Sequence, residues 1–320
     1  MTGNDRAGRG ADRRPLLLAV LGASSISASG IMITLAATGA VTAAFYRCFL
    51  AVPGLVLLAV LEQRRRGPRL PAARAGAFVA GLFLSVDLVL WNHAIAEVGA
   101  GIATVLGNLQ VLFVAFVAWA VFRERPERRF LIFLPVVMAG VVMVSGLVGR
   151  AGSGTHPLAG IGYGIGTSLA YAAFLLTLRR TSSGSPHVAG PLAEATGGAV
   201  LGTVLIGLVA GGLQFHIPWA SFGWLLLLAM TSQTLGWLLI TSSLPRLPAA
   251  ISSLALLLQP AAAMLLAAIV LDERPTPVQI AGAVVVCCGV LAVSLSASSS
   301  KPEAGRPGED LEPAATGSLA

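Results

Sequence analysis

Long apolar segments alternate with short polar turns along most of the chain. An α-helix of about 20 apolar residues spans the hydrocarbon core of a bilayer. Ten segments reach or approach this length: residues 16–37, 41–61, 75–96, 101–122, 130–147, 158–178, 188–210, 219–240, 249–271 and 278–295. The pattern therefore predicts an all-α integral membrane protein with ten transmembrane helices.

The second half of the chain repeats the first. Residues 91–144 align without a gap on residues 240–293, at a constant offset of 149 positions. Matches include Gln110 with Gln259, Gly140 with Gly289, and Glu124-Arg125-Pro126 with Glu273-Arg274-Pro275. A constant offset through loops indicates an internal repeat. We expect a first five-helix repeat at 16–148, a linker outside the cell at 149–157, and a second five-helix repeat at 158–296.

Composition supports the membrane assignment. The 320 residues are 56% hydrophobic and only 11% charged, whereas soluble domains carry about a quarter charged residues. The net charge is +7, but the arginines form short clusters between apolar segments rather than a basic stripe. This distribution excludes nucleic acid as a partner and leaves the lipid bilayer and a small molecule.

The basic residues predict the orientation. If the N-terminus is cytoplasmic, 18 of the 21 lysines and arginines fall in cytoplasmic segments, and only Arg150 and Arg274 fall outside. Cytoplasmic loops of membrane proteins carry this excess of positive charge. We expect a multi-pass protein of the cell membrane with a cytoplasmic tail at 1–15 and a disordered cytoplasmic tail at 297–320. Because five helices precede the second repeat, that repeat enters from the opposite side, so the repeats are inverted.

Two charged residues lie deep inside predicted spans, Arg47 in the second and Asp87 in the third, whereas Glu194 lies early in the seventh, near the cytoplasmic headgroups. A charge at the centre of a span costs about 2.5–3.5 kcal/mol and needs a partner or water. An Arg47–Asp87 pair that holds the bundle together is one reading. The alternatives are that Arg47 binds an anionic substrate group, to which its fork of donors is suited, and that Asp87 carries a coupling proton.

Other polar side chains recur every four residues and so share one face of a helix. They occupy the first, third, sixth and eighth spans, which are counterparts under the repeat. The candidates are Ser25 and Ser29; Asp87 and Trp91; Tyr163, Thr167 and Tyr171; and Gln233, Trp237 and Thr241. Asn92, near the outer end of the third span, is added to them. Each one alone fits an interhelical hydrogen bond. Together they predict the wall of a substrate cavity.

The repeated Glu-Arg-Pro turns, Glu124-Arg125-Pro126 and Glu273-Arg274-Pro275, are interpreted as helix ends, because proline opens the next helix and the charges suit the interface. They carry a structural or gating role rather than a catalytic one. The three cysteines lack the spacing of a metal site. We therefore expect no metal site.

The sequence resembles a known transporter repeat. The resemblance rests on Ala249-Ala250-Ile251-Ser252-Ser253, Leu258-Gln259-Pro260, Asp272-Glu273-Arg274-Pro275, Gln279-Ile280-Ala281-Gly282 and Gly289, and in the first half on Arg47-Cys48-Phe49-Leu50-Ala51, Gly101-Ile102-Ala103, Glu124-Arg125-Pro126 and Gly140. These segments resemble the EamA-type repeat of the drug/metabolite transporter superfamily. The resemblance implies ten helices, cytoplasmic termini, and export or exchange of small metabolites without a bound cofactor.

The sequence therefore predicts a secondary transporter, not an enzyme, that moves a small polar metabolite, such as an amino acid-like compound, out of the cell by alternating access between the repeats. No Walker A motif is present, which excludes direct use of ATP as far as sequence can. An integral-membrane enzyme acting on a lipid-linked substrate and a non-transporting receptor are the alternatives. The coupling ion and assembly as a homodimer stay open.

Overall fold

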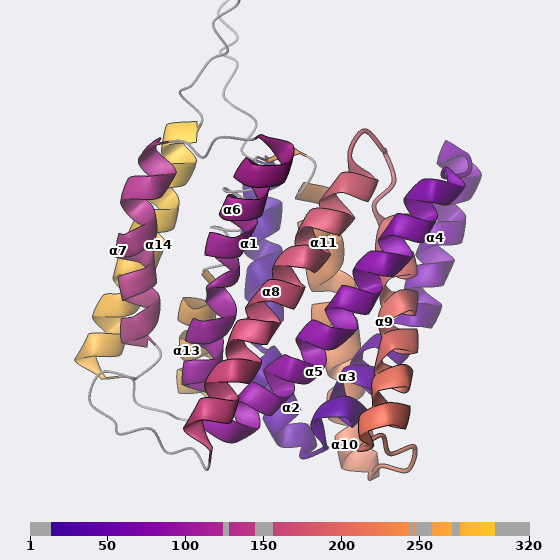
Figure 1. Cartoon of the computed structure of the whole chain (residues 1–320), viewed down its shortest axis with the longest axis horizontal. Helices are drawn as coiled ribbons and strands as arrows, with labels where there is room; N and C mark the ends of the chain where they lie inside the picture. Colours follow the sequence, from indigo (N-terminus) through magenta and orange to yellow (C-terminus); the bar gives the residue numbers. More distant parts are fainter. Residues whose placement is uncertain are drawn as a thin grey trace, which may run out of the picture.

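The computed structural model describes residues 14–123, 128–144, 156–243, 246–247, 256, 258–270 and 276–297. Within these ranges every regular element is a helix, and the helices run up and down side by side (Figure 1). Six helical segments of the described residues are long and apolar enough to cross a membrane, and shorter apolar helices accompany them. The prediction of an all-α membrane protein is confirmed.

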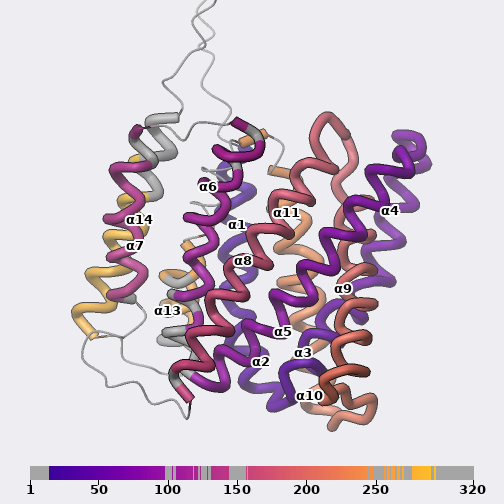
Figure 2. Tube along the Cα trace, in the orientation of Figure 1, coloured from indigo at the N-terminus to yellow at the C-terminus, as the bar shows by residue number. Residues whose placement is uncertain are grey.

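The first half contains seven described elements: α1 (Arg14–Ser27), α2 (Ser29–Ala36), α3 (Ala40–Phe49), α4 (Val52–Arg66), α5 (Pro71–Asn108), α6 (Gln110–Phe122) and α7 (Arg128–Val144). The second half contains α8 (Pro157–Ser182), α9 (Ala189–Ala210), α10 (Trp219–Leu228), the π-helical segment η1 (Ala229–Gly236), α11 (Trp237–Ser243), α13 (Leu258–Val270) and α14 (Pro277–Ala297). The trace of Figure 2 follows these segments along the chain.

Several predicted spans consist of more than one helix. The first is α1 and α2, interrupted at Ala28, and the second is α3 and α4, interrupted at Leu50 and Ala51. Pro53 has no N–H to donate to the carbonyl four residues earlier, which accounts for the second interruption. The eighth combines α10, η1 and α11.

One predicted boundary is wrong. The sequence placed a loop between spans 75–96 and 101–122, but α5 continues through residue 108 and the break falls at Leu109. The side chain of Ser168 in α8 donates to the carbonyls of Leu106 and Gly107, which satisfies acceptors at this helix end. A contact from a distant helix therefore fixes the boundary.

The turns show that the two halves are inverted. At one end of α9, His187 Nε2 donates to the Gly67 carbonyl at 3.0 Å, which joins the segment after α8 to the turn after α4. At the other end of α9, Thr42 Oγ1 donates to the Gly212 carbonyl at 2.9 Å, beside the turn after α2. The turn after α2 therefore lies at one end of α9, and the turn after α8 lies at the other end. The first span of each half thus runs in the opposite direction to the first span of the other half.

Glycines set the closest helix contacts. A Cβ atom at Gly81 of α5 would lie 1.8 Å from the Ala195 carbonyl oxygen, and one at Gly198 of α9 would lie 2.1 Å from that of Phe78. Only glycine allows the two backbones to approach this closely. These contacts hold α9 against α5, and α5 also packs along α8. The resulting bundle buries a core in which Phe174 and Trp237 are the largest fully or almost fully buried side chains.

A second, smaller core lies at the other side of the molecule, where α7 and α14 pair (Figure 1). Val111 of α6, Val137 of α7, Ala261 of α13 and Val286 of α14 belong to it. The fourth, fifth, ninth and tenth predicted spans thus share one core, and the polar residues discussed below lie outside it.

Candidate functional site

A chain of three buried polar side chains crosses the larger core. Arg47 of α3 is only 4% exposed, and its Nε donates to Gln233 Oε1 at 3.0 Å. Gln233 Nε2 in turn donates to Thr196 Oγ1 of α9 at 3.3 Å. Gln233 lies in the π-helical segment η1, and π-helical turns are frequent at functional sites. The arginine is therefore held at a fixed place by two other helices.

Asp87 lies close to this chain but does not pair with it directly. The carboxylate is within electrostatic range of the Arg47 guanidinium. Among the described residues the ion pairs are Arg66–Glu62, Arg69–Glu194 and Arg74–Glu194, so the Arg47–Asp87 pair suggested by the sequence does not form. Thr167 Oγ1 of α8 donates to the Asp87 backbone carbonyl at 2.9 Å.

Aromatic side chains flank the buried arginine. Trp237 of α11 makes edge-to-face contacts with Phe174 and Tyr171 of α8, at ring-centroid distances of 4.9 and 6.0 Å. Tyr171 is also within electrostatic range of Arg47 and lies close to the Gln259 side chain. Five of the predicted cavity residues, Arg47, Asp87, Tyr171, Gln233 and Trp237, are therefore brought together.

Several polar atoms around this cluster are buried without a hydrogen-bond partner, including Trp237 Nε1, Thr241 Oγ1 and Gln259 Nε2. Buried polar groups are nearly always paired, so each exception needs an explanation such as a bound molecule or water. All three atoms can donate. The cluster is therefore rich in donors that an acceptor group of a ligand would satisfy.

Ser25 and Ser29 act between helices rather than at the cluster. Ser25 Oγ donates to the Thr231 carbonyl at 2.8 Å, and Ser29 Oγ donates to Ser232 Oγ at 2.8 Å. Both bonds join the first span to η1. These two serines thus support the helix that carries Gln233.

Trp91 and Asn92 lie in the middle of α5, and Tyr163 lies near the start of α8. Asn92 Nδ2 donates to the Ala40 carbonyl at 2.9 Å, at the start of α3. Tyr163, two turns from Tyr171 along α8, stacks on His93 with ring centroids 5.3 Å apart. Trp91 is half-buried. Asn92 thus contacts the start of α3 and Tyr163 contacts His93, rather than the Arg47 cluster.

Sequence reasoning missed Thr196 and Gln259 at the cluster. Thr196 gave no signal, because a single threonine in an apolar helix is commonplace. Gln110 and Gln259 did give one, since they occupy the same position in both repeats. Gln110 Oε1 and Gln259 Nε2 are both buried without a hydrogen-bond partner. For Gln259, which lies close to Tyr171, recurrence in both repeats was thus a signal for the site.

The Glu-Arg-Pro turns, Glu124-Arg125-Pro126 and Glu273-Arg274-Pro275, lie outside the described residues, as do residues 1–13, most of the linker and residues 298–320. Within the described part of the chain, no group of three or more His, Cys, Asp and Glu side chains is arranged to hold a metal ion.

Comparisons with known proteins agree with this architecture. A solved structure described as "Crystal structure of protein" superposes with a TM-score of 0.72 at 13% sequence identity, covering 88% of this chain and 98% of that one. This similarity concerns the fold alone. No curated protein matches the chain. The model of the EamA-like transporter family matches twice, at residues 13–146 and 158–295, one match for each half. With two inverted repeats that together cover most of its length, the chain belongs to the EamA-like transporter family.

Proposed function

We propose that this membrane transporter exports a small metabolite that carries a carboxylate and an amino group. The proposal rests on the hydrogen-bond donors of Arg47 that have no partner among the described residues. Within the described part of the chain the Arg47 side chain has one hydrogen-bond partner, Gln233, which leaves both terminal Nη groups free. The planar guanidinium fork matches a carboxylate.

The surroundings of Arg47 support an amino acid-like substrate. The unpaired donors Trp237 Nε1 and Gln259 Nε2 add to the attraction for a carboxylate. Asp87 provides a negative charge within electrostatic range of Arg47, where a substrate ammonium group would find its partner. The aromatic rings of Tyr171 and Trp237 offer an apolar surface for the rest of the molecule.

Alternating access would follow from the inverted repeats. Two halves of similar sequence but opposite orientation can exchange conformations, which turns a site open to one side into a site open to the other. The substrate site would lie between the halves, since Arg47 and Asp87 come from the first and Gln233 and Trp237 from the second. Transport of this kind is driven by existing gradients.

Metabolite profiling tests the proposal. We would compare cells that lack the protein, cells that overproduce it, and cells that overproduce Arg47→Gln at equal abundance. One or more amino acid-like compounds should rise outside and fall inside cells with the native protein only. The proposal is wrong if the affected compounds lack a carboxylate, or if Arg47→Gln exports them equally well.

A further inference from the structure

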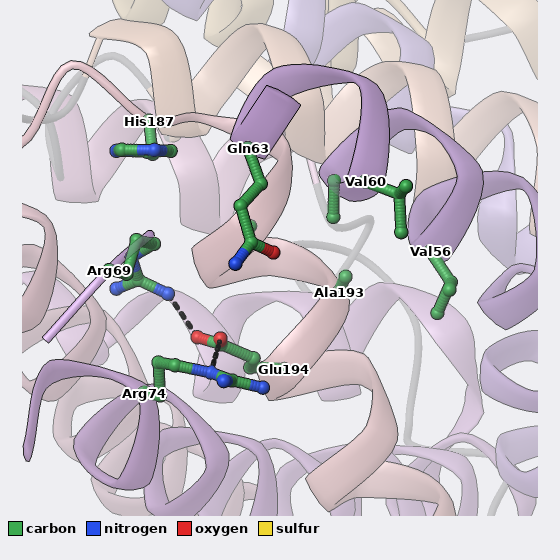
Figure 3. Close-up of a pocket in the computed structure, with 10 residues that line it drawn as sticks. Val56, Val60, Gln63, Arg69, Arg74, His187, Ala193 and Glu194 are labelled. Carbon is green, nitrogen blue, oxygen red and sulfur yellow. Dashed lines mark hydrogen bonds and ion pairs between the residues drawn. The ribbon is translucent and has the colours of Figure 1, made fainter. Parts of the chain in front are cut away.

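A pocket of about 190 Å³ lies between α4, the start of α5 and α9, away from the Arg47 cluster. One end is polar and is lined by Gln63, Arg69, Arg74 and Glu194, and the other end is apolar and includes Val56 and Val60 (Figure 3). No part of the proposed transport mechanism uses this pocket.

The polar end is organised around Glu194. Its carboxylate accepts from Arg69 Nη1 and, at 2.9 Å, from Arg74 Nε. The Arg69 side chain is 5% exposed, and its Nη2 donates to the Thr181 carbonyl at 3.3 Å. Among the lining residues, the two arginines and one glutamate leave a net charge of +1 at this end of the pocket. Glu62, which accepts from the Gly190 amide beside the pocket, is offset by its ion pair with Arg66.

Donors remain unused there. Arg69 Nε is buried without a partner. Within the described residues the terminal Nη groups of Arg74, whose side chain is 58% exposed, have no partner, and neither has the Gln63 amide. A positively charged pocket with donors from three side chains, one of them buried and unpaired, fits an anion with several acceptor oxygens.

The apolar end identifies the kind of anion. Val56 and Val60 are 45% and 42% exposed, on a helix that spans the bilayer. Exposed apolar side chains of such a helix meet lipid acyl chains. Arg64, Arg65 and Arg66 follow in the last turn of α4, which places the polar end at the level of the headgroups. The pocket thus runs from the headgroup region into the acyl region.

We infer that this pocket binds one anionic phospholipid. The phosphate accepts from Arg74, Gln63 and Arg69, and an acyl chain lies along Val56 and Val60. A monoanionic headgroup balances the net charge of +1. A soluble anion would gain nothing from the apolar end, and a zwitterionic lipid would bring no net charge.

Native mass spectrometry of the full chain, purified in detergent, tests this inference. Phosphatidylglycerol and phosphatidylcholine with identical acyl chains are titrated separately. We expect phosphatidylglycerol to bind more tightly, and Arg74→Gln to weaken its binding about tenfold, because the variant loses charge-assisted hydrogen bonds to the phosphate. The matched control is Arg128→Gln, because Arg128 is exposed at the start of α7, far from α4 (Figure 1). That control should bind phosphatidylglycerol like the native chain.

The outcomes separate the alternatives. Equal binding of the two lipids, or equal effects of the two arginine changes, would overturn the inference. Displacement of the lipid by inorganic phosphate at low concentration would show that the pocket recognises the free anion instead. Glu194→Gln is a second test. Loss of the carboxylate raises the positive charge of the pocket, so the folded variant should bind phosphatidylglycerol more tightly than the native chain.

Discussion

Arg47 Nε donates to Gln233 Oε1 at 3.0 Å, which links the second span of the first repeat to the π-helical segment of the second repeat. Both side chains are buried, and they come from positions 186 residues apart. The bond joins the two halves at the proposed substrate site, so changes at either residue report on both folding and transport.

Gln233→Leu should destabilise the protein. The change leaves Arg47 Nε and Thr196 Oγ1 without their partner, and an unsatisfied buried group costs about 1–3 kcal/mol, more when it is charged. We expect a lower melting temperature in detergent. Gln214→Leu, at an exposed side chain in the segment after α9, is the control and should melt like the native protein. Equal melting temperatures of the two variants would contradict a stabilising role of the Arg47–Gln233 hydrogen bond.

Arg47→Ala should abolish transport while membrane abundance stays nearly unchanged. The substitution removes the need to pair a buried charge, which offsets the Gln233 Oε1 acceptor that it leaves unsatisfied, so the fold loses little. Arg47→Lys keeps the charge but not the fork of donors, and should transport at a small fraction of the native rate. If Arg47→Ala instead lowers abundance, and the double change with Asp87→Ala restores abundance and transport, then Arg47 is structural.

Trp237→Phe separates packing from hydrogen bonding. Phenylalanine preserves an aromatic ring against Phe174 and Tyr171 but has no donor to replace the unpaired Nε1. We expect nearly native abundance and a higher KM for the transported substrate. Trp219→Phe, at an exposed ring, should leave the KM unchanged. An unchanged KM in Trp237→Phe would remove the indole N–H from the substrate site.

Gly198→Ala tests the close contact of α5 and α9. Its methyl group would lie 2.1 Å from the Phe78 carbonyl oxygen, so the helices must separate, and overpacking of this kind costs about 1–3 kcal/mol. The neighbouring Gly197→Ala is a matched control, since nothing lies within 4 Å of its Cβ position. We expect a marked loss of folded protein for Gly198→Ala only, measured by size-exclusion chromatography after heating.

Cysteine labelling tests the inverted arrangement. Ser183→Cys and His216→Cys lie beyond opposite ends of α9, and both positions are exposed. In a background without the three native cysteines, an impermeant reagent should label them from opposite sides of the membrane. The charge distribution predicts Ser183 inside and His216 outside. Labelling of both from one side would refute the fold, and the reverse pattern would refute only the orientation.

The sequence by itself determined the class of the protein and its repeat. Segment length and composition sufficed for membrane spans, because a bilayer demands about 20 apolar residues per helix. The constant offset between Gln110 and Gln259 revealed the repeat. Because each repeat has an odd number of helices, the second must be inverted relative to the first, and the turns at Gly39 and Gly67 show this inversion. The polar positions Arg47, Asp87 and Gln233 stood out because such side chains are costly in hydrocarbon.

Only the tertiary structure decided which of these side chains meet. Arg47 bonds to Gln233 rather than to Asp87, although Asp87 lies on the next span in sequence. Sequence could not show this, because lipid-facing and protein-facing surfaces are both apolar in a membrane, so periodicity does not reveal the neighbour of a helix. The neighbour is chosen by small residues such as Gly81 and Gly198, whose partner backbones come from distant segments. The same long-range packing brings Arg69 and Arg74 onto Glu194 and ends α5 at Leu109.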